Sequence, residues 1–200
     1  MARLSPLELS RLAREFKRER KQVWDRERRY YVEVRSLSEA IDAALGLRSN
    51  DLIPDHQRRV ARAALTLARR HLLQRRKSLA AVRNFRELHD LIELVSEHVP
   101  RFGKLAVYDV AWRLGIYLGK EPDLVYLHAG TKEGASALGV GGERAELNEF
   151  PRSLQIMSPS QLEDFLCICK NALRGEIPYT TARREIKFSC SKSGSICQFD

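Results

Sequence analysis

Apolar residues recur every three or four positions along most of the chain, which is the spacing of one face of a helix. This periodicity predicts about seven helices and an all-α fold. The helices are expected at residues 5–31, 37–45, 54–84, 84–99, 104–118, 131–138 and 158–175.

Several predicted helix starts carry a recognisable capping pattern. Ser5, Asn84 and Ser158 are each followed three residues later by Glu or Gln. In this pattern the first side chain accepts a hydrogen bond from a free helix amide, and the second reaches back. Thr131 is expected to cap the short helix that reaches Leu138.

The same pattern predicts one compact, multi-helix domain over residues 1–178, with a less regular tail over 179–200. Within the domain we expect N-terminal helices, a central part with a basic helix and a hairpin, and a C-terminal helix. These parts cover residues 1–50, 54–139 and 158–175. The tail is expected to be extended or mobile, with Ile186 and Phe188 as candidates for a short strand.

Charge adds a first indication of function. The 200 residues include 35 Lys or Arg and 26 Asp or Glu, which gives a net charge of +9 and a pI near 9.6. Such an excess favours polyanionic partners, chiefly nucleic acid and less so anionic membranes. No apolar run approaches the length that spans a bilayer, and the first residues lack a signal-peptide core, so a cytoplasmic location is expected.

The positive charge is concentrated in residues 54–84, which hold nine Lys or Arg and one acidic residue, Asp55. Leu65, Leu72 and Leu79 repeat every seven residues, and so do Arg62, Arg69, Arg76 and Arg83. Seven residues are nearly two helical turns, so each series is expected to form one stripe. The arginine stripe is either a solvated flank or a phosphate-facing ridge, and the scarcity of acidic residues favours the ridge.

A second feature is the segment VPRFGKLAVYDVA at residues 99–111. An apolar residue and a proline end one helix, a tight turn with Gly103 follows, and a second helix begins at Lys104. Glycine lets a backbone approach a phosphate closely, and the free amides at a helix start bind anions. Arg101, Gly103 and Lys104 are therefore predicted to position a DNA phosphate.

The segment resembles the helix-hairpin-helix motif, whose usual form is Leu-Pro-Gly-apolar-Gly-x-x-Thr-Ala. Arg101 stands where the motif has its first glycine. Because arginine disfavours positive φ, the turn is expected to be altered.

Residues 99–139 also resemble the helix-hairpin-helix DNA glycosylases. The resemblance implies a catalytic Asp at position 126 and, in bifunctional members, a lysine nucleophile at position 105. Tyr126 and Leu105 occupy these positions, which argues against a standard glycosylase. The block from Val107 to Gly139 further resembles a family of uncharacterised bacterial proteins, often carried on mobile elements, which implies no activity.

Four polar residues remain as candidates for catalysis: Tyr108, Asp109, Tyr126 and His128. Asp109 can pair with Arg113 four residues later on the same helix, and a structural ion pair is the simpler interpretation. His128 is either a general base, a phosphate ligand or a hydrogen-bonded structural group that caps the next helix.

No metal or cofactor is predicted. Cys167, Cys169, Cys190 and Cys197 lack a Cys-x-x-Cys spacing and are expected to be free thiols. Cys190 and Cys197 match only the first interval of the glycosylase iron–sulfur loop.

The leading hypothesis is therefore a DNA-binding protein without assigned catalysis, which contacts the phosphate backbone. Arg62, Arg69 and Arg76 would add affinity that is independent of base sequence. One alternative is a divergent DNA glycosylase or lyase that uses Asp109 or His128. Another is a helical module whose arginines bind an acidic protein partner.

Overall fold

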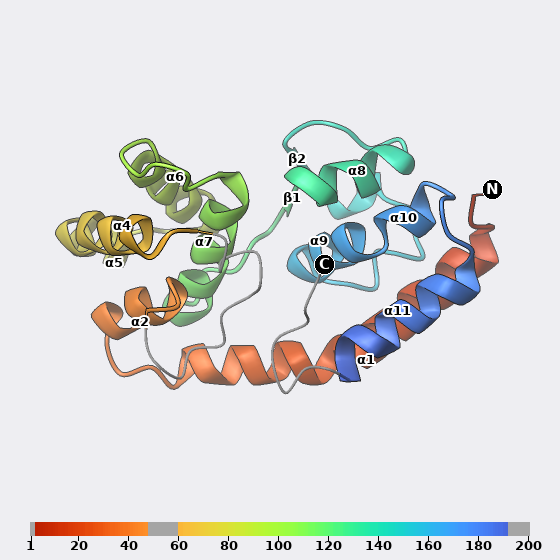
Figure 1. Ribbon diagram of the computed structural model, residues 1–200, viewed down its shortest axis with the longest axis horizontal. Coiled ribbons are helices and arrows are strands. Elements are labelled where there is room, and N and C mark those ends of the chain that lie inside the picture. The colour runs from red at the N-terminus through yellow and green to blue at the C-terminus, as the bar shows by residue number, and fades with distance from the viewer. Residues whose placement is uncertain (1–2, 48–59, 192–200) are drawn as a thin grey trace. The chain divides into compact units, whose positions relative to one another are not determined.

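The computed structural model describes residues 3–47 and 60–191, and side chains as far as Ile186 (Figure 1). The chain is all-α, with 66% of residues in helices and one two-stranded sheet in the described part. The helices are α1 (Pro6–Val32), α2 (Leu37–Ala44), α4 (Arg62–Gln74), α5 (Arg76–Ala80), α6 (Phe85–Ser96), α7 (Lys104–Leu118), α8 (Ala129–Ala137), α9 (Pro159–Ile168), α10 (Lys170–Leu173) and α11 (Tyr179–Ser191). The shorter elements are β1 (Val125–Tyr126), β2 (Arg144–Ala145) and the 3-10 helix η1 (Leu147–Glu149).

The described chain divides into two compact units, where the sequence predicts one domain. The first unit contains residues 3–23 and 123–191, and the second contains residues 24–47 and 60–122. The division after Pro122 falls inside the block from Val99 to Gly139, which the sequence treats as continuous. None of the described helices has the length and apolar character needed to cross a membrane.

The first unit is built on the contact between α8 and α9. Gly134 makes this contact close, since a Cβ placed there would lie 2.2 Å from the carbonyl oxygen of Leu166. Phe16 of α1 meets Phe165 edge to face, with ring centroids 5.2 Å apart. Helix α11 lies beside α1, where Arg183 pairs with Glu15 at 2.8 Å.

The same unit holds the small sheet. β1 and β2 are antiparallel, with Val125 opposite Ala145. Both residues are buried.

The second unit is organised around the hairpin of α6 and α7, against which α2 and α4 pack (Figure 1). Leu65 and Leu72 of α4 and Leu79 of α5 are all buried, as predicted, but the break at Arg75 places them on two helices and not in one stripe. Apolar side chains from the other helices complete this core, including Ile41, Leu45, Leu88, Ile92, Val110 and Leu114.

Three predicted helix starts are confirmed. The amide of Glu8 donates to Ser5 Oγ at 3.3 Å, and the amide of Glu87 donates to Asn84 Oδ1 at 2.9 Å. Ser158 and Gln161 form the full reciprocal arrangement. The prediction for Thr131 is wrong, because α8 begins at Ala129 and the Thr131 hydroxyl bonds elsewhere.

Two long predicted helices are each broken in the structure. The described part of 54–84 divides into α4 and α5 at Arg75, and 158–175 divides into α9 and α10 at Cys169. Neither break is marked by glycine or proline, the residues that usually interrupt a helix. The predicted start near Pro54 lies outside the described residues.

The expected extended tail is wrong for residues 179–191, which form α11. Ala182 and Ile186 are four residues apart and both buried, so they form the packing face of a helix rather than of a strand. Residues 192–200, including Cys197, lie outside the described part, as does the side chain of Cys190.

Candidate nucleic-acid interface

The turn between α6 and α7 is held at both ends by buried side chains. Val99 is 3% exposed and Phe102 is 5% exposed, and the amide of Phe102 donates to the carbonyl of Val99 at 3.2 Å. Pro100 and Arg101 are the two exposed residues between them. A proline second and a left-handed residue third are the arrangement of a type II turn.

Arg101 has φ of 62°, one of two described non-glycine residues with positive φ. This corrects the sequence expectation, because the turn keeps the backbone that glycine usually supplies. A left-handed residue with a Cβ costs roughly 1–2 kcal/mol. The buried anchors Val99 and Phe102 hold the turn in this geometry, and Arg101 is exposed between them.

The start of α7 is open beside this turn. Gly103 is the N-cap, forms no side-chain cap, and has no atom within 4 Å of the position of a Cβ. The first turn of α7 contains no acidic residue, and Lys104 is exposed. The start of α7 therefore adjoins the predicted phosphate ligands Arg101, Gly103 and Lys104. Backbone amides at a helix start can bind an anion.

The arginine stripe does not form as predicted. Arg69 Nε lies 2.5 Å from Asp42 Oδ1, so its charge is engaged by α2. Because the helix breaks at Arg75, Arg76 begins a separate helix and is not aligned with Arg62 on one continuous axis. Arg62 and Arg76 are both exposed.

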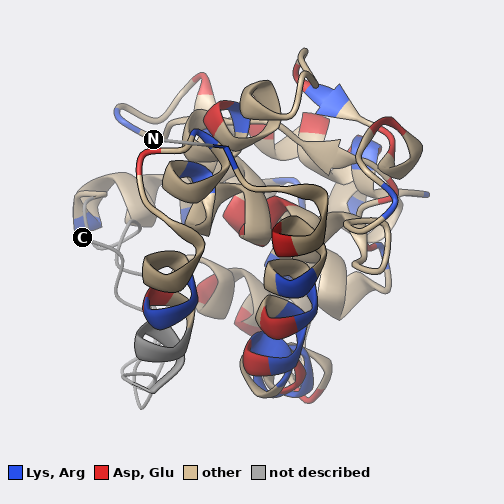
Figure 2. Ribbon diagram, turned by 90° about the vertical axis from the view of Figure 1, so that its right-hand side faces the viewer, with Lys and Arg blue, Asp and Glu red and all other residues tan. Residues whose placement is uncertain are grey.

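Other positive charges are also partly neutralised. Arg83 Nη2 lies 2.5 Å from Glu87 Oε1, and its side-chain and backbone hydrogen bonds lower the pKa of Glu87. Figure 2 shows acidic residues among the basic ones along the described ribbon. The net charge of the whole chain thus overstates the charge available to a polyanion.

Asp109 belongs to a buried electrostatic group centred on Arg113, which is 2% exposed. Arg113 Nη1 donates to the carbonyl of Ala44 at 3.1 Å, and its Nε lies 3.5 Å from Glu27 Oε1. Burial acts to lower the pKa of Arg113, but Tyr31, Asp109 and Glu27 together raise it.

The sequence missed Glu27 as a partner of Arg113. Trp24, Glu27 and Tyr31 share one face of α1, and all three are buried. An acidic residue on an apolar face was the signal that could have revealed it.

His128 lies in a buried polar cluster in the first unit. Its Nε2 is 3.3 Å from Glu163 Oε1, which also accepts a hydrogen bond from Thr131 Oγ1 at 2.6 Å. All three residues are buried, and His128 stands at the N-cap position of α8 without a side-chain cap. The cluster joins α8 to α9, so His128 contacts Glu163 and its side chain does not cap α8 as the structural interpretation expected.

The two tyrosines among the catalytic candidates belong to different units. Tyr108 is buried in the second unit, with its ring 6.1 Å from that of Phe85. Tyr126 is buried in the first unit, where the Arg144 guanidinium lies 5.1 Å from its ring centroid.

One group of described residues has the composition of a metal site. His89, Asp90 and Glu93 on α6 have ligand atoms within 4.8 Å of one another. Arg86 Nε lies 3.9 Å from Asp90, so a cation already neutralises part of this group. In the first unit, burial raises the pKa of the Cys169 thiol, which makes it a poor metal ligand at neutral pH.

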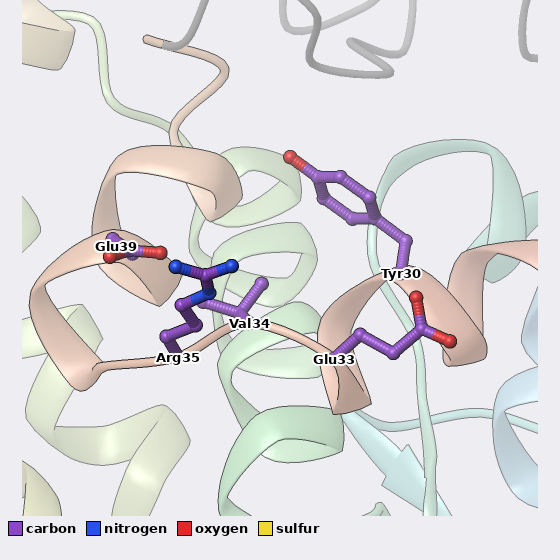
Figure 3. Close-up of a pocket in the computed structure, with 5 residues that line it drawn as sticks. All are labelled: Tyr30, Glu33, Val34, Arg35 and Glu39. Atoms are coloured by element: carbon purple, nitrogen blue, oxygen red, sulfur yellow. The ribbon is translucent and has the colours of Figure 1, made fainter.

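A hollow of about 460 Å³ lies at the connection between α1 and α2. Figure 3 shows the Arg35 guanidinium directed toward Glu39, while Tyr30 and Glu33 lie on the other side. Two carboxylates and one guanidinium give this hollow no excess of positive charge, so it is not part of the basic surface.

Comparison with protein-family models, curated proteins and solved structures finds no match to this chain. The geometry of the chain's own residues is therefore the basis for any functional assignment.

Proposed function

We propose that the chain is a DNA-binding protein that contacts the phosphate backbone through the turn between α6 and α7. The observation that carries this proposal is the left-handed backbone of Arg101 in a turn fixed by buried neighbours. Strain at a surface residue persists where the surrounding structure over-determines it, and such residues cluster at functional positions.

Three features at this turn favour an anion. The Arg101 guanidinium can form two parallel hydrogen bonds with a phosphate. Amides at the start of α7 supply further donors and the positive end of the helix dipole. Lys104 is exposed and adds a second positive charge at the same helix start.

The same turn fits duplex DNA better than a small anion, since Arg62 and Arg76 on the same unit are exposed and lie on separate helices. Contacts with backbone phosphates provide affinity and position but no sequence information. The glycosylase hypothesis stays a prediction, because Asp109 and His128 make the contacts of structural groups. The protein-interaction hypothesis also stays a prediction.

The test is anisotropy of a fluorescently labelled duplex of mixed sequence, titrated with the full chain over a series of salt concentrations. Each phosphate contact contributes about 0.9 to the slope of log affinity against log salt. Arg101→Gly should weaken binding and lower that slope by about 0.9. Arg152→Ala removes an exposed charge in the other unit and serves as the matched control.

Binding that is undetectable at low salt would exclude DNA as the partner. Equal slopes for Arg101→Gly and the unaltered chain would exclude the turn as the contact.

A further inference from the structure

Helix α4 carries a stripe of polar, hydrogen-bonding side chains on its outward face, where exposed Ala63 and half-buried Leu73 also lie. Its sequence, RAALTLARRHLLQ, contains no acidic residue. Ala64, Leu65, Ala68 and Leu72 are buried and form the inward face. Four exposed residues at intervals of four form the opposite stripe: Arg62, Thr66, Arg70 and Gln74.

The chemistry of this stripe differs from that of a plain basic surface. Arg recognises guanine by two hydrogen bonds in the major groove, and Gln recognises adenine in the same way. Thr66 Oγ1 donates to the carbonyl of Arg62 at 2.9 Å, so its hydroxyl hydrogen is used within the helix. A threonine methyl is a suitable neighbour for the methyl group of thymine.

The surface along this stripe is hollowed, and none of the described residues that line the hollow is acidic. A hollow of about 450 Å³ is lined by Thr66, Arg69, Arg70, Leu73 and Gln74. Asp42 of α2 is engaged in a two-point pair with Arg69. Arg70 is therefore exposed, while the carboxylate of Asp42 is already paired with Arg69.

The dimensions agree with a groove of duplex DNA. α4 has 13 residues, which at 1.5 Å per residue is roughly 20 Å of helix. A helix with its side chains is about 10–12 Å across, and the major groove of B-DNA is about 12 Å wide. The major groove of duplex RNA is too narrow and deep for such a helix.

We infer that α4 enters the major groove of duplex DNA, with Arg70 and Gln74 contacting base edges and Thr66 contacting a base methyl group. This inference rests on the proposed function, but it adds sequence selectivity that the turn at Arg101 cannot supply. Arg76 and Lys77, exposed on α5, would contact phosphates at the rim of the groove.

The experiment selects duplexes that bind the full chain from a pool of random sequence, and then measures the affinity of the enriched duplex. Gln74→Ala should weaken binding to the enriched duplex by roughly 5- to 150-fold, the usual loss for a two-point base contact. It should leave binding to the unselected pool within about twofold, because that binding depends on the phosphates. Gln22→Ala, an exposed glutamine on α1, is the matched control and should change neither affinity.

A second variant separates charge from base recognition. Arg70→Lys keeps the positive charge but loses the planar two-point donor, so it should relax the preference at one base pair. Methylation of guanine N7 in the enriched duplex should also block binding, because N7 lies in the major groove.

The outcomes distinguish this inference from the proposed function. Salt-dependent binding without any enriched sequence, or equal affinity for duplex RNA, overturns the role of α4 and leaves phosphate binding at Arg101 intact. A pool that shows no binding at low salt overturns both.

Discussion

The guanidinium of Arg69 on α4 forms two hydrogen bonds with the carboxylate of Asp42 on α2. The Nε–Oδ1 distance is 2.5 Å and the Nη2–Oδ2 distance is 3.2 Å. The pair joins residues 27 positions apart and raises the pKa of Arg69, chiefly through these side-chain hydrogen bonds. Arg69 therefore connects two helices, although the sequence predicts it as a DNA contact.

This pair predicts different behaviour for two arginines of α4. Arg62→Ala should lower the salt slope of DNA binding by about 0.9, whereas Arg69→Ala should lower it by less. Arg69→Ala should instead reduce the free energy of unfolding by up to about 1 kcal/mol, the usual range for a partly exposed pair. Salt titrations and urea unfolding of both variants measure the two effects, and equal slopes would contradict the assignment.

The backbone of Arg101 predicts a trade between stability and binding. Arg101→Gly should raise the free energy of unfolding by about 1 kcal/mol, because glycine adopts φ of 62° without the Cβ penalty. Arg101→Ala keeps that penalty and should change stability by less than about 0.5 kcal/mol. Both variants should bind DNA weakly. Urea unfolding measures the stability of both variants, and anisotropy measures their DNA affinity. An Arg101→Gly variant no more stable than Arg101→Ala would refute the prediction.

The buried cluster of His128, Thr131 and Glu163 predicts a large cost for losing one hydrogen bond. Thr131→Val is nearly the same size but removes the donor to Glu163 Oε1. The free energy of unfolding should fall by about 1–3 kcal/mol, since a buried acceptor loses its partner. Thr180→Val, on the exposed side of α11, should change it by less than about 0.5 kcal/mol. Similar urea midpoints for the two variants would argue against the cluster.

The close contact of α8 with α9 predicts strong sensitivity at Gly134. Gly134→Ala would place a Cβ 2.2 Å from the Leu166 carbonyl oxygen, so the helices must separate. We expect a loss of about 1–3 kcal/mol, typical of overpacking. Gly141→Ala has open space and ordinary φ and should be tolerated. Thermal unfolding followed by circular dichroism compares the two, and an unchanged midpoint for Gly134→Ala would contradict the packing.

Burial of Cys169 predicts slow reaction with alkylating reagents. Because burial raises the pKa of this thiol, it stays protonated at about pH 8, where an ordinary cysteine is partly thiolate. Cys167 is half-buried and provides the internal comparison. Iodoacetamide labelling followed by peptide mass spectrometry should modify Cys167 first, and Cys169 at a comparable rate only in denaturant. Equal native rates would show that Cys169 is accessible.

The sequence by itself determined the helical character of the chain and most helix starts. The signals for these features are local, because apolar spacing and a cap such as Asn84 with Glu87 act within a few residues. Local signals also placed Val99, Gly103 and Lys104 at a tight turn between two helices. The conformation of Arg101 was not predicted, since its own propensity disfavours positive φ.

Only the tertiary structure decided which polar groups belong together. Arg69 pairs with Asp42, Arg113 lies against Glu27, and both choices depend on how distant segments pack. The helical form of residues 179–191, with Ala182 and Ile186 buried, has the same origin. In these cases the burial of apolar side chains and the pairing of charges between distant segments outweigh weak local preference. Such terms arise only when residues far apart in the sequence meet.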